Sequence, residues 1–291
     1  MSPDARTISP GSSVVTLGGR QVHLVSTPAG QPTVLLLGGC GVPSYVWDEV
    51  GTLLADLSVV RLDRPGLVDT PWPGRLPQLA EEVATLAALV QALGTSVIIV
   101  AHSMAGPHAE ALARQHPAAV TGLVLIDGSV EWEEQQPGTG RGWLLAARAV
   151  RRVMTVPVLQ PIGPLADHAM VVAQSRRRHL FDPVEPVAKA TYRRGDTVAS
   201  VVAEQAAYGA QIRDLTTVRE TAPWPSPPTV VLTAAGDGGR SWVADQRRLA
   251  ELLSARQVVL EDSRHLMMID RPDMVADAVR SVMPAKETPD D

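Results

Sequence analysis

A serine in the stretch VIIVAHSMAG has the surroundings of a catalytic nucleophile. Ser103 follows the apolar run 97–100, and the residues two positions away on either side are Ala101 and Ala105. A nucleophile on a sharp strand-to-helix turn needs small neighbours at those positions, most often glycine. The N-terminus of the following helix would aim free N–H groups at the reacting oxygen. The stretch therefore predicts Ser103 as a nucleophile, although the same pattern also occurs by chance where a strand ends in an ordinary loop.

A serine hydroxyl is a weak nucleophile and needs a histidine base. His265 lies in EDSRHL, between an expected strand at 257–260 and the last expected helix. Loops that follow parallel strands meet at one edge of the sheet, so His265 can lie beside Ser103. His102 adjoins the serine, but adjacent side chains on a sharp turn point apart. We therefore predict His265 as the base and place His102 among the candidate substrate contacts.

Two carboxylates could orient that histidine, since each follows an expected strand. Asp237 follows the strand at 229–233 and lies among glycines, and Asp127 follows the strand at 122–126. The chain order serine, acid, histidine is satisfied by both. Asp237 is preferred because it occupies the usual place, while Asp127 remains the alternative acid or a carboxylate that caps a loop.

The segment GGCG at 38–41 follows another buried apolar run and could supply a hydrogen-bond donor to an oxyanion. Glycine lets the backbone approach a substrate closely, which makes Gly39 a candidate substrate contact. We expect the backbone N–H groups of Cys40 and Met104 to form the oxyanion hole. Cys40 as the nucleophile is the rival hypothesis, but it has no helix N-terminus at its position and no histidine nearby in sequence.

Strands and helices alternate along most of the chain, which predicts an α/β fold with a mostly parallel, doubly wound sheet. Gly18-Gly19 predicts an antiparallel hairpin at the N-terminal edge. The expected strands are 14–17, 22–26, 33–37, 59–62, 97–100, 122–126, 229–233 and 257–260. The expected helices of this part are 45–56, 79–93, 104–116, 242–253 and 272–283.

The alternation stops between Gly128 and Pro228, where helical patterns are separated by proline-rich joints. We expect a core domain of residues 1–128 and 229–291, with a helical cap inserted at 129–228. Helices are expected at 143–154, 165–178 and 197–213. Candidate pocket aromatics are Trp132, Trp143, Tyr192 and Tyr208, each of which could equally pack inside the insertion. A helical domain with no role at the site is the alternative.

Five segments resemble the α/β-hydrolase fold superfamily: LLLGGCG, RLDRPGLVDTP, VAHSMAG, VVLTAAGD and VVLEDSRHLMMIDRPDMVADAV. The resemblance covers nearly the whole chain, with a cap expected where the insertion falls. This sequence has Gly38-Gly39 where the family usually has His-Gly, and Val68 replaces a family glycine. Dehalogenases and epoxide hydrolases of this fold use aspartate at the elbow, so Ser103 implies acyl transfer.

Composition narrows the remaining possibilities. The 291 residues are 45% apolar and 20% charged with a net charge of −5, and no basic stripe indicates a nucleic-acid partner. The N-terminus has no apolar signal sequence, and no apolar run reaches the ~18 residues of a membrane span. A single cysteine fits a cytoplasmic location. No metal-ligand spacing is visible, and the predicted chemistry needs no cofactor.

The function predicted from these residues is hydrolysis of an ester, lactone, thioester or related acyl bond through an acyl-enzyme on Ser103. The expected substrate is a small, partly apolar acyl compound, and the sequence leaves the oligomeric state open. Three alternatives remain: C–C bond hydrolysis, a cofactor-free lyase or cyclase, and a non-catalytic binding protein of the same fold.

Overall fold

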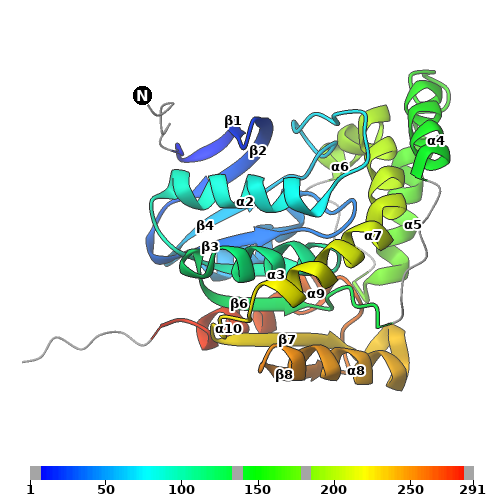
Figure 1. The fold of residues 1–291 in the computed structure, drawn as a ribbon. Helices are drawn as coiled ribbons and strands as arrows, with labels where there is room; N and C mark the ends of the chain where they lie inside the picture. The colour runs from blue at the N-terminus through cyan, green and yellow to red at the C-terminus, as the bar shows by residue number, and fades with distance from the viewer. Residues whose placement is uncertain (1–7, 133–139, 178–184, 285–291) are drawn as a thin grey trace, which may run out of the picture.

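The computed structural model describes residues 8–132, 140–177 and 185–284. The described residues form one eight-stranded sheet in the order β1-β2-β4-β3-β5-β6-β7-β8 (Figure 1). Strand β2 pairs antiparallel with both β1 and β4, so its direction is opposite to that of the other strands. Every pair from β4 to β8 is parallel. This arrangement confirms the predicted fold class and the N-terminal hairpin.

Every predicted strand is present, and most are longer than their apolar runs. The strands are β1 (Gly11–Leu17), β2 (Arg20–Thr27), β3 (Gly30–Leu37), β4 (Leu57–Leu62), β5 (Val97–His102), β6 (Val120–Ile126), β7 (Thr229–Ala234) and β8 (Arg256–Leu260). The residues of β5 and β7 are buried throughout. A central strand covered on both faces explains why these runs are continuous rather than alternating.

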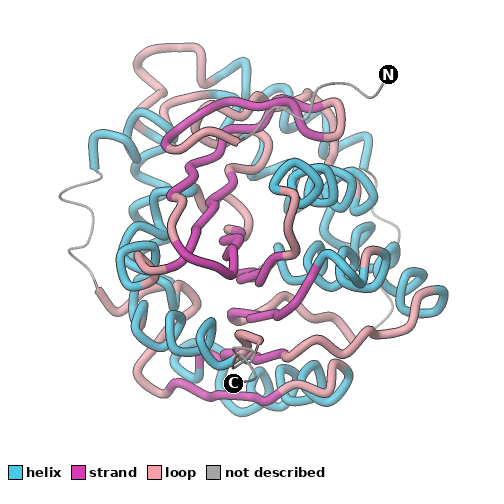
Figure 2. The backbone as a smooth tube through the Cα atoms, turned by 90° about the vertical axis from the view of Figure 1, so that its left-hand side faces the viewer, coloured by secondary structure: helices cyan, strands magenta, loops and turns pink. Residues whose placement is uncertain are grey.

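Helices cover both faces of the sheet (Figure 2). One core cluster joins β-strand residues to α2 (Leu79–Leu93), α3 (Ala105–Gln115) and α8 (Ala235–Leu252). The second cluster joins the other face to α1 (Asp48–Leu53), α9 (Met267–Asp270) and α10 (Pro272–Ser281). Short 3-10 turns, η1 (Ser44–Trp47) and η2 (Pro117–Ala119), precede α1 and β6.

The segment between β6 and β7 is helical where it is described. It contains α4 (Gly140–Val153), α5 (Ile162–Gln174), α6 (Glu185–Tyr192) and the long α7 (Gly195–Thr221). We call these four helices the insert; they fall within the predicted cap segment 129–228. In Figure 1 the upper part of α7 lies with α4 and α5 beyond the arrowheads of the strands, at the carboxyl edge of the sheet.

The sequence predicted helix bounds well where the apolar spacing is regular and poorly where helices are short or kinked. The bounds predicted for α2 match the structure, because its apolar spacing is regular and Gly94 ends it in a left-handed conformation. Helices α6 and α9 were not predicted, since eight and four residues carry too little periodicity. Helix α8 begins seven residues before the predicted position 242, with a non-helical Gly239 inside it.

No helix in the described ranges is both long enough and apolar enough to cross a membrane.

Candidate active site

Ser103 occupies a strained turn between β5 and α3. Its φ is +52°, in the left-handed region that side chains other than glycine rarely adopt. The backbone is held there by hydrogen bonds from Ser103 N to Ile126 O at 3.0 Å, from Gly106 N to Ser103 O at 3.0 Å, and from Ser129 N to Ser103 O at 3.1 Å. The small residues around Ser103 predict this sharp turn. Backbone strain that several contacts maintain is typical of a functional position.

Gly39 packs directly against this turn. A Cβ built on Gly39 would lie 2.7 Å from Ser103 Cβ and 2.9 Å from His102 Nδ1. No ordinary side chain fits at those distances, so the glycine is needed for the loop after β3 to approach the serine. Gly39 therefore packs against the side chains of His102 and Ser103, and its contact with substrate stays a prediction.

His265 and Asp127 form a close pair after β8 and β6. His265 Nδ1 lies 2.6 Å from Asp127 Oδ2. Asp127 Oδ1 accepts hydrogen bonds from Ala234 N at 3.0 Å and from Trp242 Nε1 at 2.7 Å. The carboxylate is buried, whereas the side chain of His265 is 24% exposed. This geometry fixes the Nδ1–H tautomer of the histidine and leaves Nε2 as the proton acceptor.

The described partner of His265 Nδ1 is Asp127, which the sequence offered as the alternative acid. Asp237 lies in α8 and its side chain is outside the described part of the structure, so Asp237 as the acid stays a prediction. The glycines around it have another use, because a Cβ on Gly238 would lie 2.3 Å from Trp242 Cβ and one on Gly236 would lie 2.5 Å from Ser263 O. The turn that these glycines form therefore lets Trp242 reach Asp127. From the sequence, the same glycines indicated only a flexible loop.

Two backbone amides are available beside Ser103. Among the described contacts, the amides of Cys40 and Met104 donate no hydrogen bond to the protein. Met104 is the N-cap of α3, so its N–H belongs to the positive end of that helix. The assignment of these two amides as oxyanion donors stays a prediction. Burial raises the pKa of the Cys40 thiol well above its usual value, which keeps the sulfur protonated and disfavours Cys40 as a nucleophile.

His102 is a buried, neutral neighbour of the pair. Its Nε2 donates to His265 O at 3.0 Å, and the two imidazole rings lie 4.5 Å apart. Burial is the largest cause that lowers the pKa of His102 well below its usual value, and His265 lowers it further. His102 therefore supports the loop that carries His265 and also lines the cavity, while its contact with substrate stays a prediction.

Ser103 and His265 open into one cavity of about 230 Å³. The core contributes Cys40, Tyr45 and His102 to its wall, and the insert contributes Asp167, Met170 and Tyr192. The described contacts include no hydrogen bond between Ser103 and His265. Such a bond is often long before substrate binds, so the shared cavity wall is the relevant observation.

Three of the four aromatic residues predicted for the pocket, Trp132, Trp143 and Tyr208, do not line this cavity. The ring of Trp132 stacks under the Arg248 guanidinium at 4.1 Å, and Trp143 is 54% exposed on α4. Tyr208 interacts with Ser129 and Glu131, and burial raises the pKa of its hydroxyl. Composition identified aromatic side chains in the insertion, but it could not tell which of them face the cavity.

Tyr192, one of the four candidate pocket aromatics, lines the cavity, whereas sequence reasoning missed Tyr45 and Asp167 as cavity residues. Burial raises the pKa of Asp167 to about 6, and its interaction with the Tyr192 hydroxyl acts in the opposite direction. Tyr45 and Tyr192 are themselves buried enough that the pKa of each hydroxyl is raised. No local signal marks these residues, because they meet only when the insert folds over the sheet.

The described ranges contain no group of three or more His, Cys, Asp or Glu residues placed to hold a metal ion.

The sequence of the chain matches a known protein family. Residues 34–278 match the model of the alpha/beta hydrolase family. The epoxide hydrolase CorEH has a TM-score of 0.71 at 16% identity, with 93% of this chain and 97% of that chain covered. The enol-lactonase from Burkholderia xenovorans LB400 has a TM-score of 0.68 at 17% identity, with 93% and 99% covered.

A thermophilic esterase from Thermogutta terrifontis is also similar, with a TM-score of 0.65, 21% identity, and 92% of this chain and 96% of that chain covered. At these identities the structural neighbours show the fold alone. No curated protein is significantly similar in sequence. The family match spans most of the chain, and the protein therefore belongs to the alpha/beta hydrolase family.

Proposed function

We propose that the protein is a serine hydrolase that cleaves a carboxylic ester or related acyl bond through an acyl-enzyme on Ser103. One observation carries the proposal: His265, which is paired with Asp127, lines the same cavity as the strained Ser103. Asp127 rather than Asp237 is proposed as the acid because of that hydrogen bond. The amides of Cys40 and Met104 are proposed as the oxyanion donors.

The proposed reaction has two steps. In acylation, Ser103 Oγ attacks the substrate carbonyl while His265 Nε2 takes the hydroxyl proton and then gives it to the leaving group. Asp127 stabilises the imidazolium that forms, and the two amides stabilise the negative oxygen. In deacylation, water attacks the acyl-enzyme with His265 as its base, which releases the acid and restores Ser103.

The cavity supports a small, partly apolar acyl substrate. Its volume of about 230 Å³ is limited, and the insert adds apolar side chains such as Met170 and Val171 to its wall. We propose that the insert acts as the cap of this cavity and sets which acyl groups enter. A lactone is a natural member of the substrate class, because the similar enol-lactonase has this fold.

Pre-steady-state kinetics tests the proposal. Short-chain and medium-chain p-nitrophenyl esters, lactones, thioesters and amides form the substrate panel. A burst of p-nitrophenol equal to the enzyme concentration, with an acyl adduct on the peptide that carries Ser103, is expected for at least one ester. Haloalkanes and epoxides serve as negative controls, since their hydrolysis in this fold uses an aspartate nucleophile. Turnover without an acyl adduct on Ser103 would contradict the proposal.

A further inference from the structure

The peptide of Gly41 is held on both sides by the insert. Its N–H donates to Glu204 Oε2 on α7 at 3.3 Å, and its carbonyl accepts a hydrogen bond from the hydroxyl of Tyr192 on α6. Gly41 directly follows Cys40, whose amide is one of the two proposed oxyanion donors. The conformation of this short loop therefore depends on two side chains that lie more than 150 residues away in sequence.

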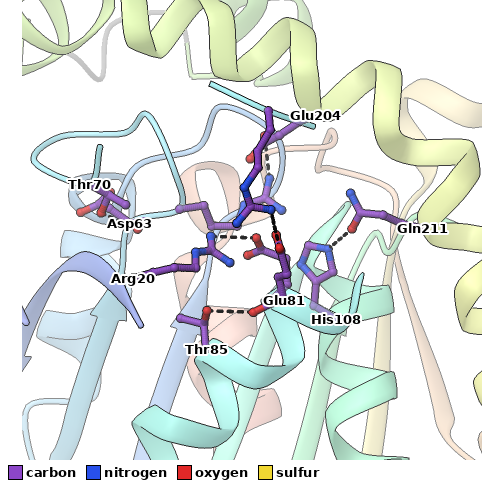
Figure 3. Close-up of polar contacts among 11 residues, drawn as sticks. Arg20, Asp63, Thr70, Glu81, Thr85, His108, Glu204 and Gln211 are labelled. Carbon is purple, nitrogen blue, oxygen red and sulfur yellow. Dashed lines mark hydrogen bonds and ion pairs between the residues drawn. The ribbon is translucent and has the colours of Figure 1, made fainter. Parts of the chain in front are cut away.

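Glu204 is itself fixed by a buried ion pair. Its Oε2 accepts from Arg64 at 2.8 Å, and both side chains are almost fully buried. Figure 3 shows Glu204 reaching down from α7 towards the loop after β4, while Gln211 of the same helix bonds with His108 of α3. The carboxylate thus bridges the insert, the end of β4 and the loop after β3 at one point.

Helix α7 also packs tightly against this loop. A Cβ on Gly41 would lie 3.0 Å from Val201 Cγ2, and the φ of Gly41 is +67°. Cys40 Sγ lies 3.7 Å from the carbonyl oxygen of Val201. A glycine-rich loop has many accessible conformations when it is free. Here packing against Val201 and two hydrogen bonds with the insert restrict that freedom.

We propose that Glu204 and Tyr192 are positioning residues that hold the oxyanion loop, so that the insert completes the oxyanion hole rather than only covering the pocket. The inference rests on the proposed acyl-transfer function. Oxyanion donors act only when they already point at the position where the charge develops. Loosening Gly41 therefore weakens transition-state binding more than substrate binding, which is a kcat effect rather than a KM effect.

The test uses Tyr192→Phe and Glu204→Gln in the full chain. Thr197→Val is the matched control, because Thr197 Oγ1 donates to Gly66 O at 2.7 Å and so joins α7 to the core away from the oxyanion loop. Each variant is assayed with a p-nitrophenyl acetate substrate, which is small enough to avoid most of the cavity wall. Inhibition by a methyl trifluoromethyl ketone, whose adduct with Ser103 carries an oxyanion, is measured in parallel.

We expect kcat to fall about tenfold or more in Tyr192→Phe and Glu204→Gln, with KM within about twofold and ketone affinity falling in parallel with kcat. Thr197→Val should keep both values. If Glu204→Gln does not fold, Tyr192→Phe still decides the question, because it removes one hydroxyl only.

If Tyr192→Phe keeps the wild-type kcat and ketone affinity, or changes only KM, the inference is overturned while the proposed function still stands. A wild-type protein that neither hydrolyses esters nor binds the ketone would overturn the proposed function, and this inference with it.

Discussion

Two serine–histidine–aspartate sets occur among the described residues, and they differ in whether the serine is hydrogen-bonded to the histidine. In the first, Ser12 Oγ lies 2.8 Å from His23 Nε2, and His23 Nδ1 lies 2.6 Å from Asp63 Oδ2. In the second, His265 Nδ1 lies 2.6 Å from Asp127 Oδ2, with Ser103 on the same cavity wall but not hydrogen-bonded to the histidine.

The surroundings of the two serines differ. Ser12 is exposed on the edge strand β1, where it pairs regularly with Val25. Ser103 is on a left-handed turn, at the N-terminus of a helix and in a cavity wall. The Ser12 set joins β1, β2 and the end of β4, and Asp63 also accepts the N–H of Ser44 at 2.7 Å. We therefore interpret the hydrogen-bonded Ser12–His23–Asp63 set as structural. A catalytic set also needs a strained nucleophile, oxyanion donors and a cavity for substrate.

The largest effect should separate the two serines. Ser103→Ala is expected to lower kcat for p-nitrophenyl ester hydrolysis by about 10³-fold or more, since it removes the nucleophile. Ser12→Ala should leave kcat and KM unchanged and alter thermal stability only slightly, because an exposed hydroxyl is lost. Steady-state kinetics on both purified variants checks this, and a comparable loss in Ser12→Ala would break the comparison.

The two aspartates should divide in the same way. Asp127→Asn is expected to lower kcat by about 10⁴-fold, because an amide favours the wrong tautomer of His265. Asp63→Asn should instead lower the free energy of unfolding by about 1–3 kcal/mol, since a buried hydrogen-bond acceptor is replaced, with kcat within a few-fold of wild type. Kinetics and urea unfolding of both variants are the measurements.

Asp237→Asn completes that experiment. We expect it to retain near-wild-type kcat, because the described hydrogen bond joins His265 to Asp127. A loss of activity in Asp237→Asn with retention in Asp127→Asn would reverse our assignment of the acid and restore the sequence-based preference.

Glycines in the two regions offer a smaller contrast. Gly39→Ala should lower kcat about tenfold, because its Cβ would lie 2.7 Å from Ser103 Cβ and must displace the turn. Gly19→Ala in the β1–β2 hairpin meets nothing within 4 Å but has a φ of +80°. It should therefore cost about 1 kcal/mol of stability with kcat unchanged. Equal kinetics in the two variants would contradict the packing argument.

The smallest expected effect concerns pH. Burial raises the pKa of Asp167 to about 6 from 3.8, so the folded state binds this proton more tightly than the unfolded state. Stability is therefore lost as pH rises from about 4 to about 6, and the loss persists above that range. The difference in free energy of unfolding between Asp167→Asn and wild type should therefore be more favourable to the variant at pH 7.5 than at pH 4. We expect this change to be on the order of 1 kcal/mol after solvent screening. Thermal unfolding at the two pH values measures it, and an equal difference at both would contradict the shift.

The sheet and part of the site were predictable because their signals are local. Buried strands such as β5 appear as continuous apolar runs, and the small residues around Ser103 are adjacent to it in sequence. His265 could be placed because it follows a strand near the end of the chain. These inferences need only periodicity, turn chemistry and the rule that loops after parallel strands share an edge.

The rest of the site depends on contacts between distant segments. The sequence placed Asp127 only by its position after a strand, and it did not reveal that Trp242 donates to Asp127 Oδ1 at 2.7 Å. The roles of Tyr192 and Glu204 at Gly41 likewise arise only when the insert packs on the core. The pocket aromatics were chosen from composition, which does not say which side of a helix faces a cavity.

The central claim is that Ser103, and not Ser12, is the nucleophile. Reaction of the wild-type protein with a fluorophosphonate, followed by proteolysis and mass spectrometry of the labelled peptides, tests it most directly. We predict one phosphonyl group per chain, on Ser103, with labelling abolished in Ser103→Ala and unchanged in Ser12→Ala. Labelling on Ser12, or none on Ser103 in an intact, folded protein, would contradict the account.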